Sequence, residues 1–262
     1  EEKYGGNLPG GGVEKDIAWI EKGEHVDYVI GWVDFLGCRI DLSEKPLIPR
    51  SETEYWTEKF LQDVRAATFS GALPLLRSGP SRLRKSRSAH MKCLDLFAGS
   101  GCIGIAILKH IPWATVDFAE KEEKFLKQIR LNAKLNGIEA KRYRIIRSDI
   151  FSGVKGTYDY ILANPPYVAE ARKTRVQKSV LENEPGGAVF GGRDGLRYIR
   201  KFLKGARSHL AQGGVMYMEF DSPQKTEVVK LAKIAGAKEV KVHKDQFGKW
   251  RYARAVFGVV DN

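Results

Sequence analysis

The sequence contains few residues that cross-link chains or bind metals. Its 262 residues include three cysteines and five histidines. The cysteines, Cys38, Cys93 and Cys102, form no Cys-x-x-Cys pair, and the histidines are not clustered. This spacing argues against a disulfide framework and a structural zinc site. We therefore expect no bound metal, cysteines that serve only packing, and a reducing compartment: the cytoplasm, or the mitochondrial matrix in a eukaryote.

Long apolar runs are also missing. No window approaches the roughly 18 unbroken apolar residues of a membrane span, and the first residues lack the apolar core of a signal peptide. Hydrophobic residues still make up 43% of the chain, which is typical of a globular protein. The length suits one α/β domain over residues 51–262, preceded by a short arm, helix and β-hairpin over residues 1–50.

Positive charge is in excess. Lysine and arginine total 44 against 32 aspartates and glutamates, a formal net charge of +12. An excess of this size suggests an acidic partner such as nucleic acid or a ribonucleoprotein, although a solvated basic surface explains it equally well. The densest basic segment, over residues 77–87, has no apolar periodicity and is predicted to be a loop or linker.

The first fifty residues predict small elements. Residues 1–12 are glycine-rich and predict a flexible arm, and residues 13–24 predict one amphipathic helix. Alternation over residues 28–40 predicts a β-hairpin around Gly31 and Gly37.

A longer helix should follow. Prolines keep residues 46–51 extended, and Ser51 with Glu54 predicts a capping box. The helix is then expected to run to about Ala67. Its predicted apolar face consists of Trp56, Phe60, Leu61 and Val64.

The rest of the chain alternates between strands and helices. The predicted strands are Lys92–Phe97, Thr115–Ala119, Tyr143–Arg147, Tyr158–Ala163, Gly214–Phe220, Glu239–Val242 and Tyr252–Val259. The predicted helices are Cys102–His110, Lys121–Leu135, Leu196–Ala211 and Gln224–Ala235. This alternation predicts an α/β fold with a mostly parallel, seven-stranded sheet and helices on both faces. No helix separates the last two strands, so the last strand should be antiparallel.

A glycine-rich loop follows the first of these strands. Gly99, Gly101 and Gly104 match the pattern Gly-x-Gly-x-x-Gly, in which the backbone approaches a ligand at a helix N-terminus. The next strand ends at Glu120, whose carboxylate can accept both ribose hydroxyls of a nucleoside. The same pattern also suits a nicotinamide dinucleotide, or a turn used only for packing.

An acidic residue before the loop favours a different cofactor. The Asp95 carboxylate would lie near the cationic methionine end of S-adenosylmethionine, whereas it would repel a pyrophosphate. Asp149 follows the third strand and could accept the adenine amino group, with Ile150 packing on the ring. A local turn cap is the alternative role for Asp149. We therefore expect S-adenosylmethionine as the cofactor.

The loop after the fourth strand reads Asn164-Pro165-Pro166-Tyr167. Ligands of open α/β sheets bind at the carboxyl ends of strands, so this loop should face the glycine loop. A carboxamide or aromatic amine nitrogen is a poor nucleophile because its lone pair is delocalised. The Asn164 side-chain oxygen and the Pro165 carbonyl can accept its two N–H groups, and the prolines fix the direction of that carbonyl. Tyr167 can pack on the flat substrate group.

Such a site needs no general base before transfer, because the proton can leave after the methyl group arrives. Its task is to position the nitrogen for in-line attack on the sulfonium methyl. A structural turn is the alternative for this loop. Its place after a strand, downstream of the glycine loop, favours methylation of nitrogen.

These motifs resemble class I, Rossmann-like methyltransferases that act on exocyclic nitrogens. Other segments resemble the HemK/PrmC family, whose members methylate the side-chain amide of the glutamine in the Gly-Gly-Gln motif of peptide chain release factors. The segments that carry this resemblance are residues 46–54, Glu184-Pro185, residues 191–196, Glu219 and Gln224. They occur in the same order as in the family, within roughly residues 25–260.

Some positions differ from the family pattern. Members usually have a helical N-terminal domain, where this sequence has room for one helix before the hairpin. Phe97-Ala98 replaces a common Gly-Thr, Glu120 replaces a common aspartate, and Ile150 stands where an aromatic residue can occur.

The resemblance implies a protein-glutamine N-methyltransferase that converts S-adenosylmethionine to S-adenosylhomocysteine. It implies catalytic roles for Asn164, Pro165, Pro166 and Tyr167. The implied cofactor contacts are Asp95, Phe97, Ala98, Gly99, Ser100, Gly101, Glu120, Asp149, Ile150 and Asn164. The same catalytic loop, with Arg50 and Glu52, is expected to contact the substrate. We expect a release factor as the partner, no membrane partner, and a monomer.

Other acceptors remain open. One is a ribosomal-protein glutamine, and another is an adenine or cytosine amino group in RNA or DNA, which the net charge favours. Base flipping normally needs extra nucleic-acid surface, and no separate target-recognition domain is evident. Residues 46–54 also favour glutamine. The loop over residues 164–167 argues against a dehydrogenase and against a non-catalytic cofactor-binding module.

Overall fold

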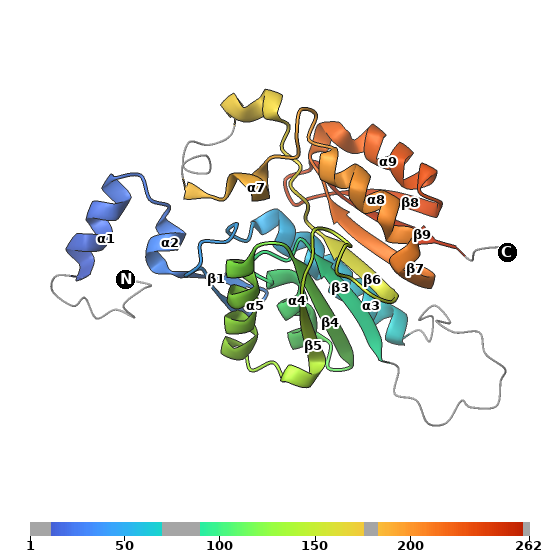
Figure 1. Ribbon diagram of the computed structural model, residues 1–262, viewed down its shortest axis with the longest axis horizontal. Helices are drawn as coiled ribbons and strands as arrows, with labels where there is room; N and C mark the ends of the chain where they lie inside the picture. The colour runs from blue at the N-terminus through green and yellow to red at the C-terminus, as the bar shows by residue number, and fades with distance from the viewer. Residues whose placement is uncertain (1–11, 70–89, 176–182, 259–262) are drawn as a thin grey trace.

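The computed structural model describes residues 12–69, 90–175 and 183–258. Its main sheet has seven strands in the order β5-β4-β3-β6-β7-β9-β8 (Figure 1). The strands are β3 (Met91–Leu96), β4 (Ala114–Glu120), β5 (Tyr143–Arg147), β6 (Tyr158–Ala163), β7 (Leu210–Glu219), β8 (Ala237–Lys244) and β9 (Trp250–Phe257). Strand β9 runs antiparallel to both of its neighbours, and the other pairs are parallel. The predicted α/β sheet with one antiparallel strand is confirmed.

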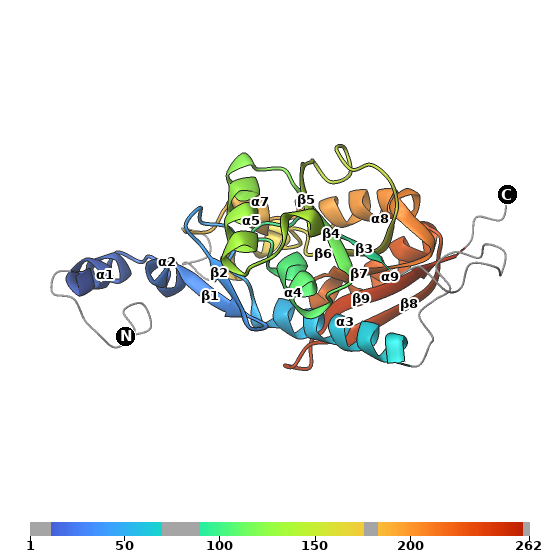
Figure 2. The ribbon, with the colours of Figure 1, turned by 90° about the horizontal axis from the view of Figure 1, so that it is seen from below.

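Helices cover both faces of this sheet. The main helices are α3 (Ser51–Phe69), α4 (Cys102–His110), α5 (Glu123–Leu135), α8 (Arg197–His209) and α9 (Lys225–Ile234). Helices α3, α4 and α5 pack on the face that contains Val116 and Tyr217, and α8 and α9 pack on the face that contains Leu94 and Met216. Figure 2 shows α3 lying along the sheet beside β8 and β9. The side chains of each strand thus alternate between two apolar layers, which makes the sheet the centre of the core.

The N-terminal elements differ in part from the prediction. The described part begins with α1 (Gly12–Glu21) and the short helix α2 (Val26–Ile30), which lie away from the main sheet in Figure 1. The hairpin consists only of β1 (Trp32–Phe35) and β2 (Cys38–Asp41). A strand at residues 28–30 was therefore a wrong prediction. Tyr28 and Val29 are both buried and successive, and a helical turn capped by Gly31 at φ 90° accommodates them.

The predicted capping box of α3 is also wrong. The Glu54 carboxylate accepts the backbone N–H of Leu36, at 2.7 Å, in the turn of the hairpin. The Ser51 hydroxyl donates to Glu52. Leu36 and Gly37 have positive φ, so the turn presents an unpaired N–H that the helix satisfies. The predicted apolar face of α3 is confirmed, because its four side chains are all buried.

The hairpin is joined to the main domain by buried amides of α5. Asn132 accepts the backbone N–H of Asp41 at 2.8 Å, and Gln128 accepts that of Glu44 at 2.8 Å. Both amide side chains are fully buried. These bonds hold the segment that leads into α3. The proposed domain boundary at residue 50 stays a prediction.

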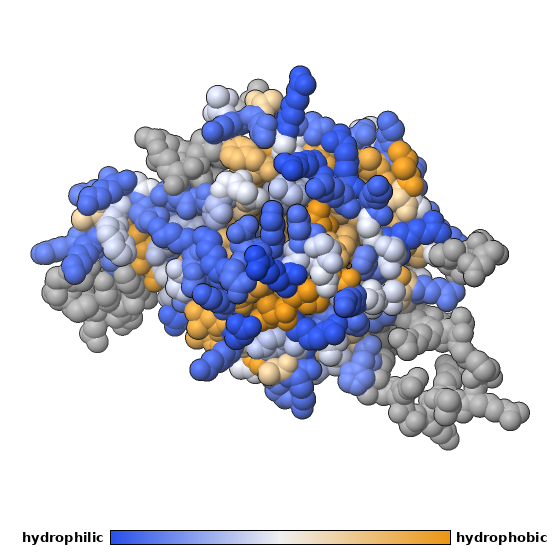
Figure 3. All heavy atoms as spheres, in the orientation of Figure 1, coloured by the Kyte–Doolittle hydropathy of each residue, from blue (hydrophilic) through white to orange (hydrophobic). Residues whose placement is uncertain are grey.

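The described surface is mostly hydrophilic on the face shown in Figure 3, with smaller hydrophobic areas between charged side chains. No helix of the described residues is long and apolar enough to cross a membrane. The predicted arm at residues 1–11 and the predicted basic loop at residues 77–87 lie outside the described residues.

Candidate active site

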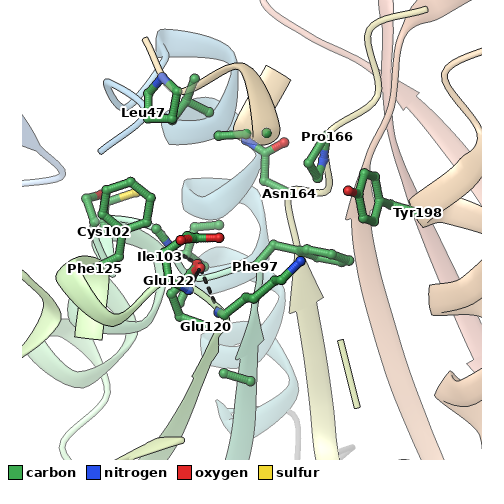
Figure 4. A pocket seen from close by; sticks show the side chains of 18 of the residues that line it. Leu47, Phe97, Cys102, Ile103, Glu120, Glu122, Phe125, Asn164, Pro166 and Tyr198 are labelled. Carbon is green, nitrogen blue, oxygen red and sulfur yellow. Dashed lines mark hydrogen bonds between the residues drawn. The ribbon is translucent and has the colours of Figure 1, made fainter. Parts of the chain in front are cut away.

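The carboxyl ends of β3, β4, β5 and β6 surround a cavity of about 270 Å³. The chain leaves β3 towards α4 on one face, and after β6 it continues to α8 on the other face. A crevice opens at such a switch point. In Figure 4, Asn164 and Pro166 lie on one side of the cavity, and Cys102 and Phe125 lie on the other.

The cavity brings together most of the predicted site residues. Those that line it are Arg50, Phe97, Ala98, Gly99, Ser100, Glu120, Asp149, Ile150, Asn164 and Pro166. The predicted residues outside the lining are Glu52, Asp95, Gly101, Pro165 and Tyr167.

The glycine loop connects β3 to α4 through a run of positive φ angles. Phe97, Gly99 and Gly101 have φ values of 62°, 53° and 79°. Positive φ is costly for phenylalanine and not for glycine. The Phe97 ring meets the Tyr198 ring edge to face, with centroids 6.0 Å apart. These two rings form an aromatic wall of the cavity beside Pro166 (Figure 4).

The third glycine of the loop serves helix–sheet packing. A Cβ atom on Gly104 would lie 2.2 Å from the ring of Phe118 on β4. Glycine therefore lets α4 approach the sheet closely. Of the glycine loop, residues 97–100 line the cavity and can contact a ligand.

Asp95 lies beneath the loop and outside the cavity lining. Its side chain is fully buried, and Oδ2 accepts the backbone N–H of Gly104 at 2.9 Å. Oδ1 has no hydrogen-bond partner among the described residues. Burial raises the pKa of this carboxyl to about 8, with a further increase from the nearby Glu120 and an opposing effect of the Gly104 hydrogen bond. In this structure Asp95 supports the start of α4.

Glu120 lies at the end of β4 and holds three backbone groups. Oε2 accepts the N–H of Gly99 at 2.9 Å, and Oε1 accepts those of Lys121 and Glu122 at 2.7 and 3.0 Å. Burial raises its pKa, while these three hydrogen bonds act in the opposite direction. The carboxylate therefore organises the glycine loop and also faces the cavity.

The segment after β5 forms another wall. Ile150 lines the cavity with a φ of 59°, and the Ser148 hydroxyl donates to its carbonyl at 2.6 Å. Asp149 is exposed, and its carboxylate lies 4.0 Å from the Lys121 ammonium group. Apolar side chains of Cys102, Ile103 and Phe125 line the same region.

The Asn164–Tyr167 loop is held by segments distant in sequence. The backbone N–H of Gly191 donates to the Val168 carbonyl at 2.9 Å, and the Gln224 amide donates to the Tyr167 carbonyl at 2.8 Å. A Cβ atom on Gly195, where φ is 76°, would lie 2.2 Å from the Tyr167 carbonyl oxygen. The 191–196 segment and Gln224 therefore support this loop.

The side chains of the loop point in different directions. The Asn164 amide nitrogen donates to the Thr53 hydroxyl at 3.2 Å, at the edge of the cavity. The Tyr167 hydroxyl donates to the Glu219 carboxylate at 2.7 Å. The structure thus places Tyr167 in a buried hydrogen-bond network, where we had expected a wall against the substrate.

Arg50 connects the segment before α3 to the residues just before α7 (Gly186–Val189). It lines the cavity and forms an ion pair with Glu184, whose side chain is fully buried. Burial raises the pKa of Glu184, and Arg50 opposes that increase. Glu52 is farther from the cavity, with its carboxylate 3.9 Å from the Arg251 guanidinium.

Comparison with known proteins identifies the family. Residues 81–193 match the model of the methyltransferase small domain. The release factor glutamine methyltransferase of Bacteroides thetaiotaomicron is 32% identical over 93% of this chain and 80% of its own length. That of Streptococcus pneumoniae is 31% identical over 86% of this chain and 72% of its own length. The chain belongs to the release factor glutamine methyltransferase family. It is therefore a methyltransferase, and the predicted resemblance is confirmed.

Solved structures agree with the fold of this family. The hMettl16 catalytic domain matches with a TM-score of 0.62 at 13% identity, over 86% of this chain and 77% of that chain. At this identity the match shows a shared fold alone. The class I methyltransferase fold that we predicted is confirmed.

Sequence reasoning missed several residues that line the cavity of this family member. They are Leu47, Ile48, Pro49, Thr53, Cys102, Ile103, Phe125 and Tyr198, among others. Thr53 and residues 47–49 belong to the segment that carried the family resemblance, so that signal could have found them. Cys102 was predicted to serve only packing; it is buried and also lines the cavity. Tyr198 gave no local signal, because its helix reaches the site through tertiary packing.

Proposed function

We propose that this chain transfers a methyl group from S-adenosylmethionine to the side-chain amide nitrogen of the glutamine in the Gly-Gly-Gln motif of a peptide chain release factor. The names of its relatives support this substrate. The main structural support for this reaction is the position of the Asn164 side chain at the cavity. Its amide nitrogen donates a hydrogen bond to the Thr53 hydroxyl. Its oxygen is left as an acceptor for an incoming amide N–H group.

The donor set of the cavity fits this cofactor. Glu120 offers carboxylate lone pairs at the end of β4, which suit ribose hydroxyls. The apolar side chains of Cys102, Ile103 and Phe125 suit a flat base, and Asp149 at the rim suits an exocyclic amino group. When bound, S-adenosylmethionine supplies an electrophilic methyl group on a sulfonium. Asp95 supports the loop from below in this proposal.

The chain's own residues would position the nucleophile. No N–H or O–H group of the described residues donates to the Asn164 side-chain oxygen or to the Pro165 carbonyl. Both remain available to accept the two N–H groups of a primary carboxamide. Such acceptors orient the nitrogen and increase the electron density on it, and the surplus proton leaves after transfer. The site therefore acts by positioning, with no general base.

The test combines an Asn164→Ala variant with two kinds of acceptor. Wild-type protein should label a release factor from radiolabelled S-adenosylmethionine, and it should not label the factor whose Gly-Gly-Gln glutamine is changed to alanine. Asn164→Ala should abolish labelling, with the dissociation constant for S-adenosylmethionine within a few-fold of wild type in calorimetry. Wild-type turnover by Asn164→Ala would refute the mechanism. Label on ribosomal or genomic nucleic acid alone would refute the substrate.

A further inference from the structure

We propose that Thr53 and Glu219 are positioning residues that fix the orientation of the Asn164 carboxamide, so that its oxygen faces the methyl acceptor. The inference deepens the proposed function and rests on it. Glu219 is a buried carboxylate outside the cavity lining, and Thr53 lies in the first turn of α3.

Glu219 is the centre of a buried network. It lies at the end of β7, is fully buried, and accepts hydrogen bonds on both oxygens. Oε2 accepts the Trp56 indole N–H and the Thr53 hydroxyl, each at 2.7 Å. Oε1 accepts the Tyr167 hydroxyl, also at 2.7 Å. Three donors from α3 and from the catalytic loop thus converge on one carboxylate.

The chemistry of these donors sets the direction of each hydrogen bond. An indole N–H can only donate, so Oε2 of Glu219 must act as an acceptor. The carboxylate then takes the single hydroxyl proton of Thr53. The Thr53 oxygen has no proton left for Asn164 and can only accept. Among the atoms of the Asn164 carboxamide, only the amino group can satisfy it, at 3.2 Å.

This ordering determines which end of Asn164 faces the substrate. A rotated carboxamide would place its oxygen against the Thr53 oxygen, where both atoms are acceptors. It would also direct an NH₂ group towards an incoming glutamine NH₂ group, where both are donors. The network therefore selects the rotamer that offers an acceptor to the methyl acceptor, and it does so before substrate binds.

Helix α3 supplies two of the three donors to Glu219. Thr53 and Trp56 are three residues apart and lie on the same face of the helix. Both are fully or nearly fully buried against the sheet. The first turns of α3 thus deliver a hydroxyl and an indole to one carboxylate, 166 and 163 residues away in sequence.

The test compares three conservative variants. Thr53→Val removes the hydroxyl and keeps the shape, and Thr53→Ser keeps the hydroxyl. Thr57→Val is the control, because Thr57 lies one turn farther along α3 and is equally buried. Among the described residues, its hydroxyl bonds only to the Thr53 backbone carbonyl. For each we would measure kcat and KM for release factor methylation, the dissociation constant for S-adenosylmethionine, and the thermal midpoint.

We expect Thr53→Val to lower kcat at least about tenfold, with cofactor affinity within about twofold of wild type. Thr53→Ser should restore kcat to within about threefold, and Thr57→Val should leave it unchanged even where the thermal midpoint falls. Equal losses of kcat in Thr53→Val and Thr57→Val would show that Thr53 contributes only to packing, which would overturn the proposal. Unchanged kcat in Thr53→Val would overturn the proposal.

A second measurement uses the free enzyme and does not depend on the substrate. The ¹⁵N side-chain amide resonance of Asn164 can be assigned by its loss in Asn164→Ala. Its proton shifts should move in Thr53→Val and stay in place in Thr57→Val. An unmoved resonance in Thr53→Val overturns the proposed orientation of Asn164 by Thr53, whatever substrate the enzyme methylates. Failure of wild-type protein to label any release factor, with the resonance moved as expected, refutes the proposed function alone.

Discussion

Glu120→Gln is the most direct test of the cofactor end of the site. The Glu120 carboxylate accepts three backbone N–H groups, from Gly99, Lys121 and Glu122. A glutamine has one acceptor oxygen and one amino group in the same space. Its amino group must face at least one backbone N–H, so a donor meets a donor. The variant also loses the charged acceptor proposed for the ribose hydroxyls.

The expected magnitude follows from these contacts. A hydrogen bond to a charged group is worth about 1.5–3 kcal/mol. The loss of one such bond to the cofactor raises the dissociation constant roughly 10- to 150-fold. The variant also weakens the hydrogen bond that holds the Gly99 loop. We therefore expect the increase in the dissociation constant to lie towards the upper end of this range.

Calorimetric titration with S-adenosylmethionine is the assay. Glu123→Gln is a matched control, because Glu123 lies nearby and its side chain is 62% exposed. It should bind the cofactor as wild type does, and circular dichroism should show that both variants are folded. A dissociation constant for Glu120→Gln within about twofold of wild type would remove Glu120 from the cofactor site.

Two further changes probe what supports the site. The pKa of Asp95 is raised by burial to about 8, above its unfolded value near 3.9, so the folded protein keeps a proton that the unfolded chain loses. Stability should therefore fall as pH rises between about 4 and 8, by up to about 3 kcal/mol from pH 5.5 to 8. Urea unfolding should show that the free energy of unfolding of Asp95→Asn falls less over this pH range than that of wild type. An equal fall in both proteins would contradict the raised pKa of Asp95. Gly195→Ala should lower the thermal midpoint by several degrees and the rate of methyl transfer by about tenfold or more. The reason is that its Cβ would lie 2.2 Å from the Tyr167 carbonyl oxygen and 2.4 Å from the Gln224 amide nitrogen. An unchanged midpoint would show that the Asn164–Tyr167 loop is not held as described.

Local pattern was sufficient for most of the main sheet. The predicted ranges Tyr143–Arg147, Tyr158–Ala163 and Cys102–His110 agree with the observed bounds. Their apolar periodicity is long enough to separate a strand from a helix. Residues 28–30 are too few for that separation, and the burial of two successive side chains favoured a helical turn.

The kinds of chemical group that surround the cavity could be read from the sequence alone. The glycine loop, Glu120 and Asn164 each follow a strand directly, and the ends of neighbouring parallel strands meet at one edge of the sheet. Their convergence is therefore a consequence of strand order, which the α/β pattern predicts. The order of the motifs along the chain carried the family resemblance for the same reason.

The hydrogen-bond partner of each polar group depends on tertiary packing and could not be read from the sequence. The Glu54 carboxylate bonds to the hairpin turn, where a capping box with Ser51 was expected. Tyr167 bonds to Glu219, 52 residues away, where a contact with substrate was expected. A carboxylate or phenol has several possible partners of equal chemical quality within one chain. The choice among them depends on how α3, the hairpin and the sheet pack, because burial leaves a polar group only the partners that packing brings within about 3 Å.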